Sequence, residues 1–139
     1  MNVVIDTNIL ISGTFFGGLP RKIIEAATNS SFLPCVNESI VQEYLKTVNY
    51  TVAKRKGSID KVLFKKFLSS VNMYPADATV KICRDPGDDK FINCAIDAKA
   101  IYIVSGDKDL LTVGEYAGVE IVTARDFWER LQKNENSGE

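Results

Sequence analysis

The chain has 139 residues, of which 45% are hydrophobic and 25% are charged, and its formal net charge is −1. These values are ordinary for a globular domain, and they exclude a protein that binds nucleic acid through a strongly basic overall surface. Histidine is absent, which excludes imidazole as a catalytic base or metal ligand, and the three cysteines form no C-x-x-C pair, which argues against a disulfide framework or a thiolate zinc site.

The sequence carries no targeting or membrane signal. No apolar run reaches the roughly 18 residues of a membrane-spanning helix, and the N-terminus lacks a basic segment followed by an apolar one. We therefore expect a cytoplasmic protein, whose reducing surroundings suit unpaired cysteines. Residues 1–132 are predicted to form one domain, and the polar residues 133–139 a disordered tail.

Apolar strands and amphipathic helices alternate along the chain. The predicted strands are residues 3–5, 32–36, 79–83, 101–104 and 119–122. The predicted helices are residues 20–28, 38–49, 59–72, 89–100, 109–116 and 126–132. This alternation predicts a three-layer α/β/α domain with a central, mainly parallel five-stranded sheet, because right-handed crossovers place helices on both faces.

Acidic residues follow the predicted strands. Asp6 closes the first strand, Asp107 follows the fourth, and Asp88 and Asp89 open the helix after the third. Taken singly, each aspartate is an ordinary helix cap, and Glu43 lies off the apolar face of its helix, where a glutamate is usually solvated. The carboxyl ends of parallel strands share one edge, however, and two carboxylates about 4 Å apart repel by about 4 kcal/mol at an effective dielectric constant near 20. Such a group is costly unless it is protonated, paired with lysine or neutralised by a cation, and for a cation oxygen-only ligands favour Mg²⁺ or Mn²⁺.

Four stretches carry a family resemblance. They are DTNILIS from residue 6, VQEY around Glu43, DPGDDKFINCA from residue 85 and VSGDKDLL from residue 104. In this order they resemble the four acidic motifs of PIN-domain ribonucleases, over nearly the whole chain, and in particular the prokaryotic branch of VapC-like toxins from toxin–antitoxin pairs. The resemblance implies a metal-dependent endoribonuclease that leaves a 5′-phosphate and a 3′-hydroxyl on single-stranded or loop RNA.

The resemblance also implies roles for individual residues. The catalytic, metal-binding quartet would be Asp6, Glu43, Asp89 and Asp107. Thr7, Asn8 and Ser105 would hydrogen-bond carboxylates or water, and Asp88 and Asp109 are either auxiliary ligands or helix caps. A homodimer and a cognate antitoxin are the expected protein partners.

Two further stretches remain open to two interpretations each. The lysines and arginine at 54–56, 61, 65 and 66 are either phosphate contacts or the solvated faces of helices. Phe15 and Phe16 either pack inside the domain or form an exposed patch for a second subunit or an antitoxin.

Other protein classes share parts of the pattern. A receiver-like signalling domain needs an acid pair after the first strand, where Asp6 stands alone, and covalent labelling by a phosphodonor would identify it. A D-x-D phosphatase needs a second aspartate where Asn8 stands. A protein-interaction module without nuclease activity would be inert on RNA.

Overall fold

The described part of the chain folds around a mainly parallel sheet. The computed structural model describes residues 1–55 and 58–137. Its strands are β1 (Asn2–Ile5), β2 (Leu33–Val36), β3 (Asn72–Met73), β4 (Tyr102–Val104), β5 (Glu115–Tyr116) and β6 (Val119–Val122). They form a six-stranded sheet in the order β3-β2-β1-β4-β6-β5, in which β5 alone is antiparallel to its neighbour. The predicted α/β class is confirmed, with six strands in place of five.

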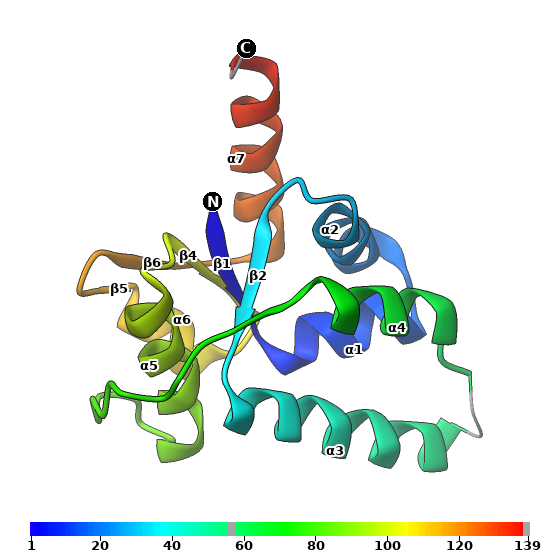
Figure 1. The fold of residues 1–139 in the computed structure, drawn as a ribbon, viewed down its shortest axis with the longest axis horizontal. Helices are drawn as coiled ribbons and strands as arrows, with labels where there is room; N and C mark the ends of the chain where they lie inside the picture. The colour runs from blue at the N-terminus through cyan, green and yellow to red at the C-terminus, as the bar shows by residue number, and fades with distance from the viewer. Residues whose placement is uncertain (56–57, 138–139) are drawn as a thin grey trace.

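Helices cover both faces of this sheet. They are α1 (Thr7–Phe15), α2 (Gly18–Thr28), α3 (Glu38–Arg55), α4 (Lys61–Ser70), α5 (Asp89–Ala98), α6 (Lys108–Val113) and α7 (Ala124–Ser137), with a short 3-10 helix η1 (Pro86–Asp88) before α5. In Figure 1, α5 and α6 lie to the left of β1 and β2, and α1, α2 and α4 lie to the right. Helix α5 packs on β1, β2, β4 and β6, whereas α7 packs on β4 and α2. None of the helices in the described ranges is both long and apolar enough to cross a bilayer.

The central strands are apolar on both faces, and their ends are polar. Val3, Val4 and Ile5 of β1 are at most 1% exposed, as expected for a parallel strand with helices on either side. Asp6 follows β1 directly, and Ser105 follows β4, its neighbour in the sheet. The fold therefore places the first polar residues after two adjacent strands at one edge of the sheet.

The predicted strand at 79–83 is wrong. This segment runs antiparallel to α5, and side chains spaced four residues apart on α5 take the place of a neighbouring strand. The acceptors are Asp97 for the Ala78 N–H at 3.0 Å, Asn93 for the Val80 N–H at 2.7 Å and Asp89 for the Ile82 N–H at 3.1 Å. Four helical residues rise about 6 Å and two extended residues about 6.6 Å, so the two spacings match.

Other element boundaries also differ from the sequence prediction. Helix α1 has no counterpart among the predicted helices. Helix α6 ends at Val113, earlier than predicted, and residues 115–122 form a hairpin whose turn residues Ala117 and Gly118 both have positive φ, as a two-residue type I′ turn requires. Residues 133–137, predicted as a tail, continue α7. Residues 56–57 and 138–139, which include Lys56, lie outside the described residues.

Candidate metal centre

Asp6 is the most buried carboxylate of the predicted quartet, at 5% exposure. Its N–H donates to the Val104 carbonyl at 2.9 Å, which extends the pairing of β1 with β4 by one residue. Ser105, fully buried, donates from Oγ to Asp6 Oδ2 at 2.6 Å. Burial raises the pKa of the Asp6 carboxyl, the Ser105 hydrogen bond opposes this shift, and the nearby Asp107 and Glu43 carboxylates reinforce it. Three carboxylates from distant parts of the chain thus influence one another at this edge.

Asp107 has a structural role and also faces the acidic group. Its N–H donates to Ser105 Oγ at 2.9 Å, and its Oδ2 accepts from the Leu110 N–H at 3.0 Å, so it caps α6. A carboxylate oxygen of Asp107 also lies within 4.8 Å of one from Asp88 and one from Asp109. The helix-cap interpretation and the ligand interpretation are therefore compatible for Asp107.

Asp88 carries the clearest sign of a crowded acidic pocket. Burial, the charge of Asp107 and a hydrogen bond with Asp107 raise its pKa to about 7, with smaller contributions from Asp85 and Asp6. Two carboxylates this close to each other repel when both are ionised. A divalent cation in the pocket would remove that conflict.

Glu43 reaches the same edge from α3 and is held from two sides. Asn37 follows β2 and caps α3 by accepting from the Ile40 N–H at 2.9 Å, which fixes where the helix begins. Thr7 Oγ1 then donates to Glu43 Oε2, and Lys90 Nζ lies 2.7 Å from Glu43 Oε1. The helical pattern predicted a solvated Glu43, but in the structure its carboxylate lies at the edge of the sheet, beside Thr7 and Lys90.

Asp89 and Asn8 are two further residues that the resemblance singles out: Asp89 binds backbone N–H groups and Asn8 lies at the surface. Asp89 Oδ1 accepts from the Cys83 N–H at 2.8 Å as well as from Ile82, and it fastens the segment before η1 to α5. Burial acts to raise the pKa of Asp89, but these hydrogen bonds lower it below its usual value. Asn8 is exposed on the first turn of α1. The three-carboxylate group contains Asp88 and not Asp89.

The donor set fits a hard divalent ion. Within the described ranges, the grouped ligand atoms all belong to carboxylates, with Asp6 and Glu43 beside them. Oxygen donors without nitrogen or sulfur are typical of Mg²⁺ and Mn²⁺ sites. Lys90 pairs with Glu43, so the charges of the other carboxylates are the ones that a bound divalent ion would balance.

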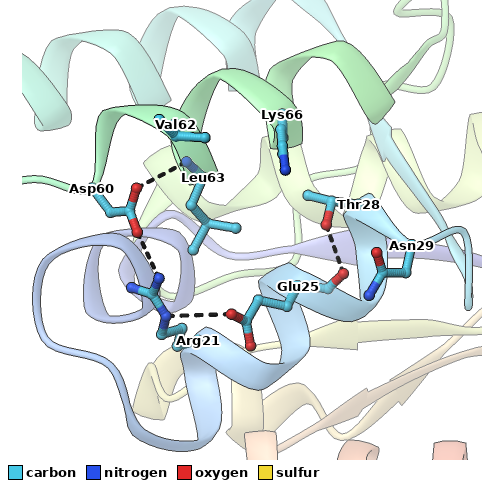
Figure 2. Close-up of a pocket in the computed structure, with 8 residues that line it drawn as sticks. All are labelled: Arg21, Glu25, Thr28, Asn29, Asp60, Val62, Leu63 and Lys66. Carbon is cyan, nitrogen blue, oxygen red and sulfur yellow. Dashed lines mark hydrogen bonds and ion pairs between the residues drawn. The ribbon is translucent and has the colours of Figure 1, made fainter.

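A hollow of about 460 Å³ between α2 and α4 is a separate feature (Figure 2). Arg21 there pairs with Asp60 Oδ2 at 2.5 Å and with Glu25 at 3.4 Å. Asp60 also accepts from the Leu63 N–H at 3.0 Å at the start of α4. Because Arg21 and its carboxylates satisfy one another, this ion-pair network joins α2 to α4 and is no alternative metal site.

Comparison with known proteins identifies the family. The PIN domain model matches residues 2–109, the part of the chain that contains the whole acidic pocket. The chain is also similar to uncharacterized protein MJ1680 of Methanocaldococcus jannaschii, with 30% identity over 145 aligned positions that cover 96% of this chain and 93% of that protein. No solved structure matches the chain significantly. The chain therefore belongs to the PIN domain family, whose members are generally metal-dependent nucleases.

Proposed function

We propose that this protein is an endoribonuclease that depends on Mg²⁺ or Mn²⁺ and hydrolyses RNA phosphodiester bonds. One observation carries the proposal: carboxylate oxygens of Asp88, Asp107 and Asp109 lie within 4.8 Å of one another, with Asp6 close enough to raise the pKa of Asp88. Asp6, Glu43, Asp88 and Asp107 would hold the metal, with Asp109 as an auxiliary ligand.

The residues around the ion have distinct tasks. When bound, the ion activates a water molecule and neutralises charge on the scissile phosphate and leaving oxygen. Ser105 fixes the Asp6 carboxylate through its hydrogen bond, and Thr7 fixes Glu43. Lys90, 23% exposed beside Glu43, carries a positive charge at the rim, where it can also contact an RNA phosphate. The carboxylates position metal and do not act as nucleophiles.

The substrate and biological role follow from the family resemblance of the motifs. We infer that accessible single-stranded or loop RNA is cut, leaving a 5′-phosphate and a 3′-hydroxyl. We further infer that the protein acts in the cytoplasm as the toxin of a toxin–antitoxin pair, as a homodimer held in check by a cognate antitoxin. Growth arrest on expression in a bacterial host, relieved by Asp88→Asn, would support the toxin role; unaffected growth would contradict it.

The adjacent residues Asp88 and Asp89, together with Asp107, supply the sharpest test of the site. In a cleavage assay on mixed RNA with Mn²⁺, we expect Asp88→Asn and Asp107→Asn to lose nearly all activity, as does the wild type with a chelator. The Asp107 variant keeps an oxygen that can cap α6, so a loss of activity in it would result from the missing charge and not from a missing helix cap. Asp89→Asn keeps an acceptor for Ile82 and Cys83, and we expect it to retain most activity.

The opposite pattern would identify Asp89 as the ligand, as the motif resemblance alone implies. Equal cleavage by the wild type and all variants would indicate a contaminating nuclease and would remove support for the proposal. A folded wild type that cleaves no RNA with either ion would also refute it.

A further inference from the structure

Helices α1 and α3 lie side by side, and contacts at both ends tie them together (Figure 1). At the acidic end, Thr7 of α1 donates to Glu43 of α3. At the far end, the Arg55 guanidinium carbon lies 4.5 Å from the centroid of the Phe16 ring, just past the last residue of α1. A surface built on these helices therefore begins at the metal centre and leads away from it.

One face of α3 carries a row of side chains along this direction. Glu43, Thr47, Tyr50 and Lys54 are spaced by four, three and four residues, which places them on one face of a helix. Tyr50 lies two turns beyond Glu43, about 10 Å along the axis, and Lys54 lies one further turn away. Tyr50 is 62% exposed and Phe16 is 63% exposed, so both rings present surface to solvent.

Positively charged side chains lie beside both the acidic end and the distal end of this row. Lys46 and Lys90 line a hollow of about 420 Å³ together with Glu43 and Thr47. Lys54 Nζ lies 5.5 Å from the centroid of the Tyr50 ring. Among residues 1–55 and 58–134, no carboxylate pairs with the Lys46, Lys54 or Arg55 side chains. Their charge is therefore available to a ligand.

The local charge contrasts with that of the whole chain. Residues 44–59 contain four lysines and arginines and no acidic residue, although the net charge of the protein is −1. Positive charge is thus concentrated on the distal part of α3 and the residues that follow it. This pattern complements a polyanion. Proteins that bind single-stranded nucleic acids use exposed aromatic rings to stack on bases and nearby cations to contact phosphates.

We propose that this α3 strip, formed by Lys46, Tyr50, Lys54, Arg55 and Phe16, binds the single-stranded RNA that continues from the cleavage site. Bases stack on Tyr50 and Phe16, and phosphates contact the three cations. The proposal rests on the proposed ribonuclease function and specifies it: the preferred substrate is an unpaired strand extending along α3 from the scissile bond. The exposed alternative for Phe16 is accordingly assigned to RNA and not to a protein partner.

Binding measured without cleavage tests the strip separately from the nuclease activity. The probe is a 12-nucleotide oligouridylate with a 5′-fluorescein, followed by fluorescence anisotropy in EDTA. Stacking on an aromatic side chain is worth about 1–3 kcal/mol per base, so Tyr50→Ala should raise the Kd at least about fivefold, while Tyr50→Phe should restore it. Lys54→Ala/Arg55→Ala should make the slope of log K against log salt shallower by about 1.4, since each phosphate contact to a single strand contributes about 0.7.

Matched controls come from other faces. Leu45→Ala removes an exposed apolar side chain from the opposite side of α3, and Lys22→Ala removes an exposed lysine from α2. Both should leave the Kd within about twofold. The proposal would be overturned if the wild type did not bind the probe, if Tyr50→Ala left the Kd unchanged, or if Leu45→Ala raised the Kd as much as Tyr50→Ala does.

The outcomes also separate the two proposals. A wild type that binds the probe through Tyr50 but cleaves no RNA would refute the nuclease function and retain the strip. Cleavage that needs Asp88, together with RNA binding that is indifferent to Tyr50 and Lys54, would refute the strip alone and leave that surface to a protein partner.

Discussion

Ser105 provides the most direct test of how the sheet positions the acids. Its hydroxyl donates to the Asp6 carboxylate at 2.6 Å and accepts from the Asp107 N–H at 2.9 Å, and the residue is fully buried. A hydrogen bond to a charged group is worth about 1.5–3 kcal/mol, and one between neutral groups about 0.5–1.5 kcal/mol. Ser105→Ala should therefore lower the free energy of unfolding by about 2–4 kcal/mol, a large share of the 5–15 kcal/mol typical of a domain.

The loss should depend on pH in a defined direction. Burial raises the pKa of Asp6, and Ser105 opposes that shift, so removing the hydroxyl raises this pKa further. A carboxyl whose pKa is raised on folding contributes stability at low pH that is lost as the pH rises through its folded-state value. We therefore expect the difference between wild type and Ser105→Ala to be larger at pH 8 than at pH 4.

Urea denaturation of the metal-free protein at the two pH values measures both effects. Thermal unfolding should show a fall in Tm of roughly 8–16 °C at neutral pH, taking about 4 °C per kcal/mol for a domain of this size. The control is Ser70→Ala, whose hydroxyl donates to the Phe67 carbonyl within α4, and which should lower the free energy of unfolding by about 0.5–1.5 kcal/mol, with no dependence on Asp6. If Ser105→Ala is as mild as this control, or its effect is larger in acid, the account of the Asp6 pocket is wrong.

Three other predictions concern the pocket and its support. Because the pKa of Asp88 is raised to about 7, the metal-free protein should lose stability as the pH rises from about 4 through 7, and Mn²⁺ should bind more tightly at pH 8 than at pH 6 with release of a proton. Calorimetry in two buffers of different ionisation enthalpy measures that proton, and pH-independent affinity would contradict the assignment. Asn93→Ala removes the side chain that accepts from the Val80 N–H and donates to its carbonyl at 3.1 Å, so unfolding free energy should fall by about 1–3 kcal/mol. Hydrogen exchange at Val80 should accelerate, and unchanged protection would show that the segment does not depend on α5. Gly13→Ala would place a Cβ 2.9 Å from the Pro20 carbonyl oxygen and the Ile24 side chain, and this overpacking should cost about 1–3 kcal/mol in urea denaturation. A neutral effect would mean that α1 and α2 can separate without cost.

The choice between Asp88 and Asp89 illustrates what sequence patterns leave open. Both residues belong to one acidic motif, and successive residues of a helix point about 100° apart, so one spacing cannot place both carboxylates at the sheet edge. The short helix η1 and its cap, in which Asp85 accepts from the Gly87 N–H at 2.9 Å, set the rotation of this turn. Asp88 then joins Asp107, while Asp89 binds the backbone before η1. Either aspartate would satisfy the motif.

The strand prediction for residues 79–83 is wrong for a related reason. Alternating polar and apolar residues indicate a half-buried extended chain, but they do not specify what the backbone pairs with. Here the N–H groups are satisfied by Asp97, Asn93 and Asp89 of a helix that follows in the sequence. Side chains of α5 therefore pair with the segment that was predicted as the third strand. The strand that lies beside β2 at this side of the sheet is the two-residue β3.

The sequence by itself determined the α/β alternation, four of the strands, and the acids that follow them, because hydrophobic periodicity and helix-cap chemistry act over a few residues. The tertiary structure alone decided which carboxylates meet, that Lys90 pairs with Glu43, and that the Lys54–Tyr50 and Arg55–Phe16 contacts lie at the end of α3 that is distant from the acidic pocket. Those outcomes depend on the rotation and packing of whole helices. A local pattern does not encode them, since the contacts that fix each helix come from residues tens of positions away.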